Sequence, residues 1–295
     1  MNHTSCVLCK SSNIIKLSKF EKHQLLKCGN CDFVFMSRIP TEEELNTHYK
    51  LYSYSNNNDV SPLTIQSYHF LLDEMEKYRK NNNILDVGCG KGWFLLEARK
   101  RGWDVYGTEF SDEAIKICRT NGIKMEKGDL SNLSFGKLKF DIVFSSEVIE
   151  HVNNPILQFQ HMYSILRPGG LLYLTTPNFN CYLRYLYKAN YNIIEYPEHL
   201  CYYTKSTMHL GLSRAGFKKW KLLTTGVSIS RACFSRAGSI NETTEIIVSK
   251  DEKLRALMVE NRLMKMIKAT VNFFLTLTGF GITLKAYYVK PNGGN

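Results

Sequence analysis

The stretch Ile84-Leu85-Asp86-Val87-Gly88-Cys89-Gly90-Lys91-Gly92 decides which fold we expect. Its first four residues form a short apolar run that ends in glycine, as a buried parallel strand does. Three spaced glycines follow, and residues 93–99 then have a helical composition. Glycines let the backbone approach a ligand closely, while the N-terminus of the next helix offers unpaired N–H groups. The order strand, loop, helix therefore predicts a cofactor-binding loop.

Acidic residues around this loop indicate which cofactor it binds. A dinucleotide fingerprint needs a glycine at position 93, where this chain has Trp93. Asp86 lies two residues before Gly88, and its charge repels a pyrophosphate but suits the sulfonium and ammonium groups of S-adenosylmethionine. Glu109 ends the second strand candidate, where a carboxylate accepts ribose hydroxyls, and Asp129 follows the third, within reach of an adenine amino group. The pattern predicts S-adenosylmethionine.

Strands and helices alternate through the rest of this region. A helix is expected at residues 156–166 and a turn at Arg167-Pro168-Gly169-Gly170. The strand candidates are residues 83–87 and 104–108, a third that ends at residues 128–130, then 140–144, 171–176 and a sixth near 220–227. This alternation predicts an α/β fold with a parallel, doubly wound, Rossmann-like sheet. We expect it to occupy residues 83–295, after a linker with helices over the substrate site at residues 41–82.

Three motifs together resemble those of class I S-adenosylmethionine-dependent methyltransferases. They are LDVGCGKG at residues 85–92, FDIVFSSEVIEHV at 140–152 and LRPGGLLYLTTPN at 166–178. The resemblance covers about residues 84–290, and it also implies a final antiparallel strand at residues 284–291.

The resemblance implies a role for each residue of the cofactor site. Asp86, Gly88 and Gly90 would hold the methionine part, Glu109 the ribose and Asp129 the adenine. The neighbouring Cys89, Phe110 and Leu130 complete the expected cofactor site, and Ser146 and Glu147 would lie beside the transferred methyl group.

The first forty residues form a separate predicted module. Cys6-x-x-Cys9 and Cys28-x-x-Cys31 are two knuckles whose four thiolates suit a tetrahedral Zn²⁺ site. Strands are expected at residues 14–17, 24–27 and 33–36, as in a zinc ribbon. A closed site with four thiolates leaves no open position for water, so this zinc is expected to be structural. Its contribution, whether nucleic-acid contact, substrate capping or anchoring, stays open.

The acceptor site is less clearly marked. The Asn/Asp-Pro-Pro-Tyr/Phe tetrapeptide of enzymes that methylate nucleobase amino groups is missing, since residues 145–148 read Ser-Ser-Glu-Val. The sequence therefore favours an oxygen or carbon acceptor on a small molecule. The candidate catalytic residues are His199 with Glu198, where a carboxylate raises the basicity of a histidine, and His151. The alternatives are that His199 bonds a backbone carbonyl and that His151 is a packed helix-start residue.

The four-cysteine module combined with Glu198-His199 resembles sugar C-methyltransferases and related enzymes of surface-polysaccharide genes. Those C-methyltransferases carry a further C-terminal α/β domain, whereas this sequence stops at Asn295. We therefore expect O-methylation of a sugar or glycan precursor. Two rival functions stay open, namely a zinc-ribbon RNA methyltransferase and a catalytically silent cofactor-fold binding module.

A net charge of +11 suggests an anionic partner such as a nucleotide-sugar, a lipid-linked sugar or RNA, with DNA not expected. The start of the chain lacks the pattern of a signal peptide, so we expect a cytoplasmic protein. An insertion at residues 229–282 has a helical apolar period at Leu254, Leu257, Met258, Asn261 and Met264. Its alternatives are core packing, a cover over the active site, a homodimer surface and peripheral membrane contact.

Overall fold

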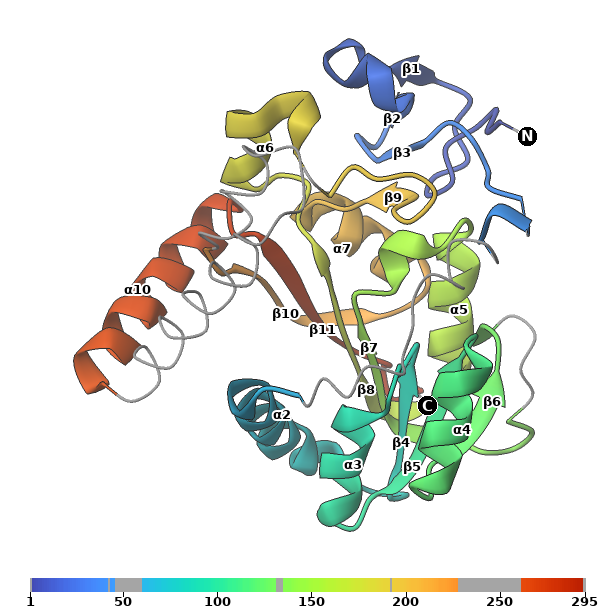
Figure 1. The fold of residues 1–295 in the computed structure, drawn as a ribbon, viewed down its shortest axis with the longest axis vertical. Helices are drawn as coiled ribbons and strands as arrows, with labels where there is room; N and C mark the ends of the chain where they lie inside the picture. The colour runs from blue at the N-terminus through green and yellow to red at the C-terminus, as the bar shows by residue number, and fades with distance from the viewer. Residues whose placement is uncertain are drawn as a thin grey trace.

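The computed structural model describes residues 2–41, 43–45, 60–130, 135–191, 193–227 and 261–293. A seven-stranded sheet with the order β10-β11-β8-β7-β4-β5-β6 forms its centre (Figure 1). Its strands are β4 (Asn83–Val87), β5 (Asp104–Glu109), β6 (Lys124–Lys127), β7 (Phe140–Ser146), β8 (Leu166–Pro177), β10 (Lys218–Thr225) and β11 (Thr283–Val289). Six strands run in the same direction, whereas β11 runs antiparallel to its two neighbours, β8 and β10. The predicted Rossmann-like sheet is confirmed.

Apolar side chains form a core on each face of this sheet. Because successive residues of a strand point to opposite faces, Leu85 and Ile84 belong to different apolar clusters. The helices α5 (Pro155–Ile165) and α7 (Lys205–Arg214) cover one face, and α2 (Pro62–Met75), α3 (Trp93–Lys100) and α4 (Asp112–Thr120) cover the other. The carboxyl ends of the parallel strands all meet at one edge, where this architecture binds its ligands.

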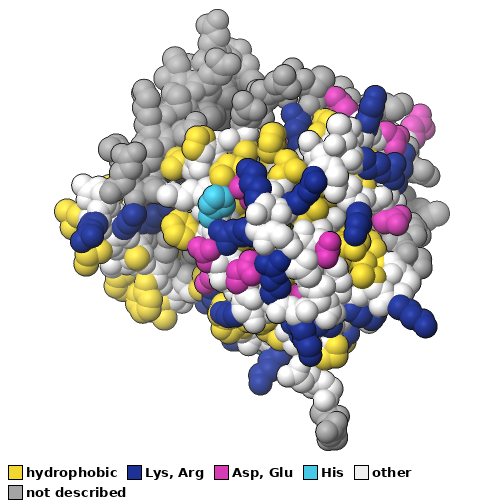
Figure 2. Space-filling model, turned by 90° about the horizontal axis from the view of Figure 1, so that it is seen from below, with side chains coloured by type: hydrophobic (Ala, Val, Ile, Leu, Met, Phe, Trp, Pro, Cys, Tyr) yellow, Lys and Arg dark blue, Asp and Glu magenta, His cyan; other side chains and the backbone are white. Residues whose placement is uncertain are grey.

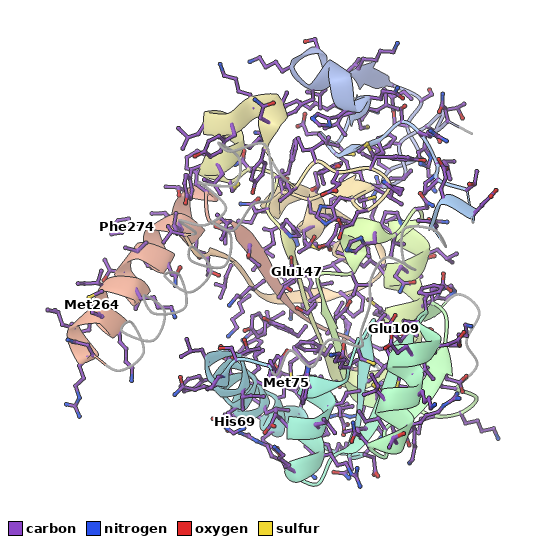
Figure 3. The ribbon with its side chains drawn as sticks, in the orientation of Figure 1. His69, Met75, Glu109, Glu147, Met264 and Phe274 are labelled. Carbon is purple, nitrogen blue, oxygen red and sulfur yellow. The ribbon has the colours of Figure 1, made fainter. Side chains whose placement is uncertain are left out.

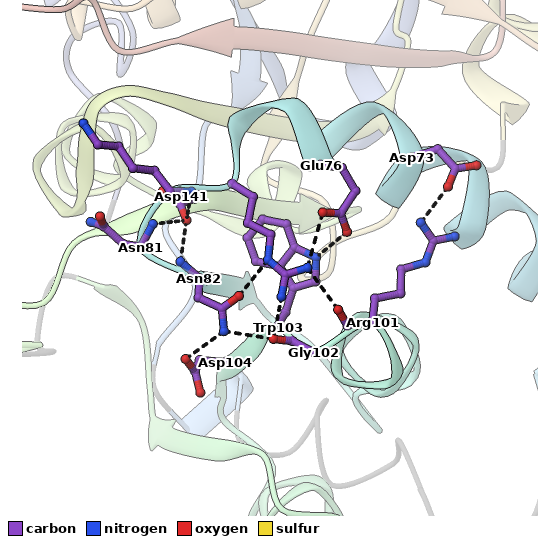
Figure 4. A network of polar contacts seen from close by, with 11 residues as sticks. Asp73, Glu76, Asn81, Asn82, Arg101, Gly102, Trp103, Asp104 and Asp141 are labelled. Atoms are coloured by element: carbon purple, nitrogen blue, oxygen red, sulfur yellow. Dashed lines mark hydrogen bonds and ion pairs between the residues drawn. The ribbon is translucent and has the colours of Figure 1, made fainter.

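A polar network anchors the segment that leads into β4, at the opposite edge (Figure 4). Asp141 is fully buried, and its Oδ2 accepts hydrogen bonds from the amides of Lys80, Asn81 and Asn82 at 2.7–2.9 Å. Its Oδ1 accepts one from Arg167 Nε at 2.5 Å. The buried carboxylate is tolerated because both oxygens have donors, and the start of β4 is thereby fixed.

The N-terminal module contains β1 (Ile14–Lys16), η1 (Ser18–His23), β2 (Leu25–Cys28) and β3 (Val34–Met36), close to the strands that the sequence predicts. Its sheet has a fourth strand, β9 (Cys201–Tyr202), which is distant in the sequence from the other three. Val34 pairs with Tyr202, and Phe35 pairs with Cys201. The module therefore shares a sheet with the segment that follows His199.

The boundary between α5 and β8 differs from the expected one. A turn was expected at residues 167–170, but β8 begins at Leu166, which already pairs with Phe140. Gly169 has a φ of 74° inside the strand, and the ladder to β7 is irregular between Phe140 and Ile142. Glycine tolerates this conformation, so the bend is accommodated without ending the strand.

The helix α10 (Arg262–Thr278) corrects the expectation of core packing for the part of the insertion that the structure describes. None of its residues is buried, and Leu263, Phe273 and Leu277 are each more than 60% exposed. Figure 2 shows hydrophobic side chains gathered where this helix projects, at the left of the view. Residues 228–260, with Leu254, Leu257 and Met258, lie outside the described ranges. Within those ranges no helix is long and apolar enough to cross a membrane.

Candidate functional site

The glycine loop is held tightly against β5. The amides of Gly88 and Cys89 both donate to the carbonyl oxygen of Thr108, at 3.0 and 3.1 Å. Gly88 has a φ of 71°, and a Cβ atom added there would lie 2.6 Å from the side chain of Val148. A larger residue at position 88 is therefore excluded both by the backbone conformation and by the segment after β7.

Asp86 supplies a buried negative charge at the end of β4, where its side chain is only 4% exposed. Burial, and then the nearby Cys118 and Glu109, raise the pKa of its carboxyl group well above the usual value. Among the described residues no hydrogen bond or ion pair to this carboxylate is found. A buried carboxylate beside a second one is stabilised by a cation. The site thus fits the ammonium group of S-adenosylmethionine.

Glu109 holds the loop from the neighbouring strand. Its Oε2 accepts a hydrogen bond from the amide of Gly90 at 3.0 Å, and its Oε1 accepts from the amides of Phe110 and Ser111. A carboxylate has about four lone pairs, so Glu109 keeps capacity for ribose hydroxyls. The contact that the sequence predicts with the ribose stays a prediction.

The residues expected around the adenine lie beside this carboxylate. Phe110 is 57% exposed and adjoins Glu109, Asp129 is half-buried just after β6, and Leu130 is buried. An exposed aromatic ring, a carboxylate and a buried leucine at one edge suit a nucleobase, which stacks and donates from its amino group.

Ser146 and Glu147 end β7 next to β8. Glu147 has a φ of 55°, and its amide donates to the carbonyl oxygen of Thr175 at 3.0 Å. The hydroxyl of Thr175 donates to Glu147 Oε1 at 2.8 Å and lies 2.9 Å from the hydroxyl of Ser146. Thr175 was not predicted, because nothing in the sequence aligns β7 with β8 at this position.

The structure brings His151 and His199 together, with ring centroids 5.0 Å apart. His151 closes the short helix η4 (Ile149–His151), and its Nδ1 lies 2.7 Å from the carbonyl oxygen of Glu198. His199 Nδ1 lies 2.7 Å from the carbonyl oxygen of Ile193. A carbonyl only accepts, so each Nδ1 carries a proton. His151 also forms a hydrogen bond with the backbone of Glu147. The contact of His199 with Ile193 is the carbonyl bond that the alternative for His199 anticipated.

The charge state of His151 follows from its surroundings. Burial, and then the neighbouring His199, lower the pKa of His151 to about 4, although the carbonyl and carboxylate of Glu198 oppose the shift. His151 is therefore neutral at physiological pH. Glu198 thus acts on His151 through its carbonyl and its charge, and its predicted effect on His199 stays a prediction.

Glu150 lies behind the histidines. Its side chain is 2% exposed, and its Oε2 accepts a hydrogen bond from the hydroxyl of Thr176 at 2.9 Å. Glu150, His151 and His199 each offer a ligand atom within 4.8 Å of the others. Among the described residues, this cluster and the four cysteines are the groups with such an arrangement.

The four cysteines of the N-terminal module converge on one point. Cys6 Sγ lies 3.6 Å from Cys31 Sγ, and Cys9 Sγ lies 3.4 Å from Cys28 Sγ, with all four sulfurs within 4.8 Å of one another. Sulfurs about 2.3 Å from a tetrahedral zinc ion are about 3.8 Å apart. The amides of Cys9 and Asn30 donate to Cys6 Sγ and Cys28 Sγ. The donors thus fit a Zn²⁺ ion.

This module contacts the segment that carries His199. Phe20, Val34 and Met36 of the module pack with Ile193, Ile194 and Leu200 in one buried cluster. The amide of Met36 donates to the carbonyl of Leu200, and the amide of Leu200 donates to the carbonyl of Glu150. The cysteine module therefore contacts the segment that carries His199, and that segment in turn contacts η4.

Comparison with known proteins gives the family. A family of proteins described as "Methyltransferase domain" matches residues 61–222, more than half of the chain. The ubiquinone biosynthesis O-methyltransferase of Coxiella burnetii is 30% identical over 120 residues, which are 38% of this chain and 51% of that protein. The rat mitochondrial ubiquinone biosynthesis O-methyltransferase is 37% identical over 105 residues, 32% of this chain and 30% of that protein. The chain thus spans about half the length, or less, of these relatives.

Solved structures agree on the fold. A putative sarcosine dimethylglycine methyltransferase from Galdieria sulphuraria has a TM-score of 0.52 at 13% identity, over 78% of this chain and 86% of that chain. Phosphoethanolamine N-methyltransferase 2 of Haemonchus contortus, in complex with S-adenosyl-L-methionine, has a TM-score of 0.50 at 16% identity, over 85% of this chain and 57% of that chain. Together with the glycine loop and the strand-end carboxylates, the family match shows that the chain belongs to the family of S-adenosylmethionine-dependent methyltransferases.

Proposed function

We propose that the enzyme methylates a hydroxyl oxygen of a small-molecule acceptor, with a sugar or glycan precursor as the acceptor class. The observation that carries this proposal is the pair of histidines just beyond the end of β7, 5.0 Å apart and each with its Nδ1 against a backbone carbonyl. A hydroxyl group must lose its proton on methylation, and a fixed neutral imidazole is the side chain that takes it near pH 7.

The residues of the chain divide the work. S-adenosylmethionine supplies a methyl group on a positively charged sulfur when it is bound, with Asp86, Glu109 and the glycine loop as its proposed contacts. The acceptor oxygen forms the new bond to carbon as the carbon–sulfur bond breaks, and the hydroxyl proton moves to a histidine Nε2. The carbonyls of Ile193 and Glu198 hold the two rings so that Nε2 faces away from them. Orientation of the acceptor and removal of its proton are the parts played by this chain.

The four cysteines are proposed to hold a structural Zn²⁺ ion. Their sulfur distances suit a tetrahedral ion, and a bound metal contributes free energy to the folding of a small module. We propose that the ion keeps β3 in place, and that β3 in turn keeps β9 and His199 in place through their shared sheet. The zinc would then act on the acceptor side without contacting any reacting atom.

Two observations support an oxygen acceptor over the rivals. Two relatives, 30% and 37% identical to the chain over the matched residues, are named as O-methyltransferases. The residues after β7 also lack the tetrapeptide of amino-group methylation. The sugar class rests on the likeness of the cysteine module and Glu198-His199 to sugar-modifying enzymes, and it is the finer part of the proposal.

The test is methyl transfer from labelled cofactor to four acceptor classes: nucleotide-sugars, lipid-linked sugars, catechols and RNA. Labelled product is then cleaved to identify an O-methyl ether. We expect label on a hydroxyl oxygen of one sugar class. Label on catechol alone would correct the acceptor class and keep the chemistry. Label on nitrogen, or on RNA alone, would contradict the proposed function.

A further inference from the structure

A lysine that the cofactor site does not use lies beside the end of β7. Lys285 is the third residue of β11, where it pairs with Thr175 of β8. Residues directly opposite each other in an antiparallel pair point to the same face of the sheet. Since the hydroxyl of Thr175 donates to Glu147, the side chain of Lys285 extends on the face where Glu147 is anchored. Lys285 is therefore close to the proposed methyl-transfer position.

Among the described residues, the ammonium group of Lys285 forms no hydrogen bond or ion pair, since Lys285 pairs in the sheet through its backbone. Two carboxylates act on it electrostatically, Glu147 and Glu74. However, Glu147 accepts from Thr175, and Glu74 forms an ion pair of 2.6 Å with Lys221. Both carboxylates already have partners.

A second lysine approaches from α10. Residues 264, 272, 275 and 276 are the half-buried positions of this helix, so they mark its inner face. Lys268 lies on the same face, four residues before Asn272, whose side-chain oxygen accepts from the amide of Gly226 in the connection after β10. Burial, and then the charge of Lys268, lower the pKa of Lys285. Lys268 itself is exposed, so it acts on the half-buried Lys285 through its charge from the solvent side.

Figure 3 shows where this happens. Glu147 lies at the end of the sheet between two helices, α10 with Met264 and Phe274 labelled and α2 with Met75 labelled. The half-buried Lys285 lies beyond two buried tyrosines of the same sheet face, Tyr173 and Tyr287, whose rings are 4.7 Å apart. Burying an ammonium group beside another one costs free energy that an anion offsets. The positively charged sulfur of a bound cofactor would increase this free-energy cost, and with it the stabilisation that an anion gives.

We propose that Lys285 and Lys268 form a subsite for a phosphoryl group of the acceptor. This inference rests on the proposed function, because it assigns the anionic part of the same acceptor molecule. Lysines bind phosphate as point charges, so two of them suit a group with several equivalent oxygens. Thr175 and Thr176 point to opposite faces of β8, with Lys285 beside the first and Glu150 beside the second. The acceptor therefore reaches around the end of this strand, its phosphoryl group at Lys285 and its hydroxyl at the histidines.

The experiment measures binding of inorganic pyrophosphate to the full chain loaded with S-adenosylhomocysteine, by calorimetry at low salt. Three variants are compared with the wild type: Lys285→Met, which keeps the apolar stem, Lys285→Arg, which keeps the charge, and Lys268→Met on the exposed helix. Arg262→Met, at the start of the same helix, is the matched control. Melting curves and binding of S-adenosylhomocysteine establish that each variant is folded.

We expect saturable binding that weakens at least about tenfold in Lys285→Met and about threefold in Lys268→Met. Lys285→Arg and Arg262→Met should bind like the wild type. Should Lys285→Met fail to fold, the Lys268→Met comparison decides. Equal binding by wild type and folded variants, or equal weakening by Arg262→Met, would overturn the subsite. Tighter binding of malonate than of pyrophosphate would overturn its assignment to phosphoryl groups.

The transfer assay separates this inference from the function it rests on. If label goes to a hydroxyl oxygen but pyrophosphate neither binds at Lys285 nor competes with the acceptor, the subsite is wrong and the function stands. If pyrophosphate binds through Lys285 but label appears only on nitrogen, the subsite stands and the function is wrong. A lower kcat with a shifted pH profile and unchanged pyrophosphate binding in Lys285→Met would make Lys285 a base and overturn the proposal.

Discussion

The two halves of the ligand edge are built in different ways. On the cofactor side, Asp86, the glycine loop and Glu109 come from 24 consecutive residues of the chain, 86–109, and each carboxylate stands at a strand end. On the acceptor side, the histidines come from residues 151 and 199, and the sheet beside them comes from residues 34–36 and 201–202. Residues that are close together in the sequence therefore form the proposed cofactor site. Contacts between residues far apart in the sequence form the proposed acceptor site.

The halves also differ in electrostatics. The cofactor side buries Asp86 near Glu109, with a carboxyl pKa raised well above its usual value by burial first. The acceptor side buries a neutral His151, whose pKa is lowered to about 4. In the proposed reaction, the first side attracts the positively charged cofactor and the second side accepts a proton. Changes on one side should therefore leave the other side largely intact.

The largest effect is expected on the acceptor side. Asparagine in place of His199 or His151 should lower kcat by about 10²–10⁴-fold for the histidine that takes the proton, with unchanged affinity for S-adenosylhomocysteine. His209→Asn, whose Nδ1 lies 2.9 Å from the hydroxyl of Tyr288 in the body of the fold, is the control. If the His151 or the His199 variant also lost affinity for S-adenosylhomocysteine, the cofactor side and the acceptor side would not be independent.

The pH profile decides between the two histidines. The base must be unprotonated, and the pKa of His151 is about 4. If His151 takes the proton, kcat/KM stays level as pH falls and declines only near pH 4. A decline that begins well above pH 4 excludes His151 as the group that takes the proton. Stopped assays from pH 4.5 to 8 measure this.

A smaller effect, on cofactor affinity rather than on kcat, is expected at Asp86. Asp86→Asn should weaken S-adenosylhomocysteine binding by about 10–100-fold, because the buried ammonium group loses its charged partner. The same change should stabilise the ligand-free protein. With a raised carboxyl pKa, the wild type loses stability as pH rises from the unfolded value of about 3.9 through the folded value, and the variant does not. Melting curves across pH measure this, and a less stable variant would refute the electrostatic reading.

The smallest effects concern helix caps. Ser111 Oγ accepts from the amide of Ala114 at the start of α4, and Thr204 forms a capping box with Thr207 at the start of α7. Alanine at either position should cost about 1 kcal/mol in urea unfolding. Ser111→Ala should also weaken cofactor binding severalfold, since Ser111 adjoins Glu109, whereas Thr204→Ala should not. Equal cofactor affinity of Ser111→Ala and Thr204→Ala would contradict the expected difference between the two sides of the ligand edge.

The sequence predicted the cofactor side in detail because its signals are local. Glycines need positive φ, and strand-end carboxylates follow apolar runs, so both can be identified without knowing the topology. The four cysteines were predictable for the same reason, since their two pairs have the spacing of zinc knuckles.

The acceptor side could be predicted only in part. His151 and His199 were found by their positions after strands, but their contact depends on a loop that returns across the sheet. The pairing of β3 with β9 joins residues more than 160 positions apart, and no periodicity reports it. Lys285 did leave a signal, a lysine between Leu284 and Ala286 in an apolar strand, and that interruption marks a buried charge.

The most direct test of the separation between the two halves is the affinity for S-adenosylhomocysteine before and after removal of zinc. The full chain is titrated by calorimetry with bound zinc, and again after chelation or as Cys28→Ser, while methyl transfer and hydrogen exchange in residues 193–203 are followed in parallel. The account predicts that affinity changes by less than about twofold, that transfer is lost and that exchange in this segment rises. Loss of cofactor affinity together with zinc, or full transfer without it, would contradict the account.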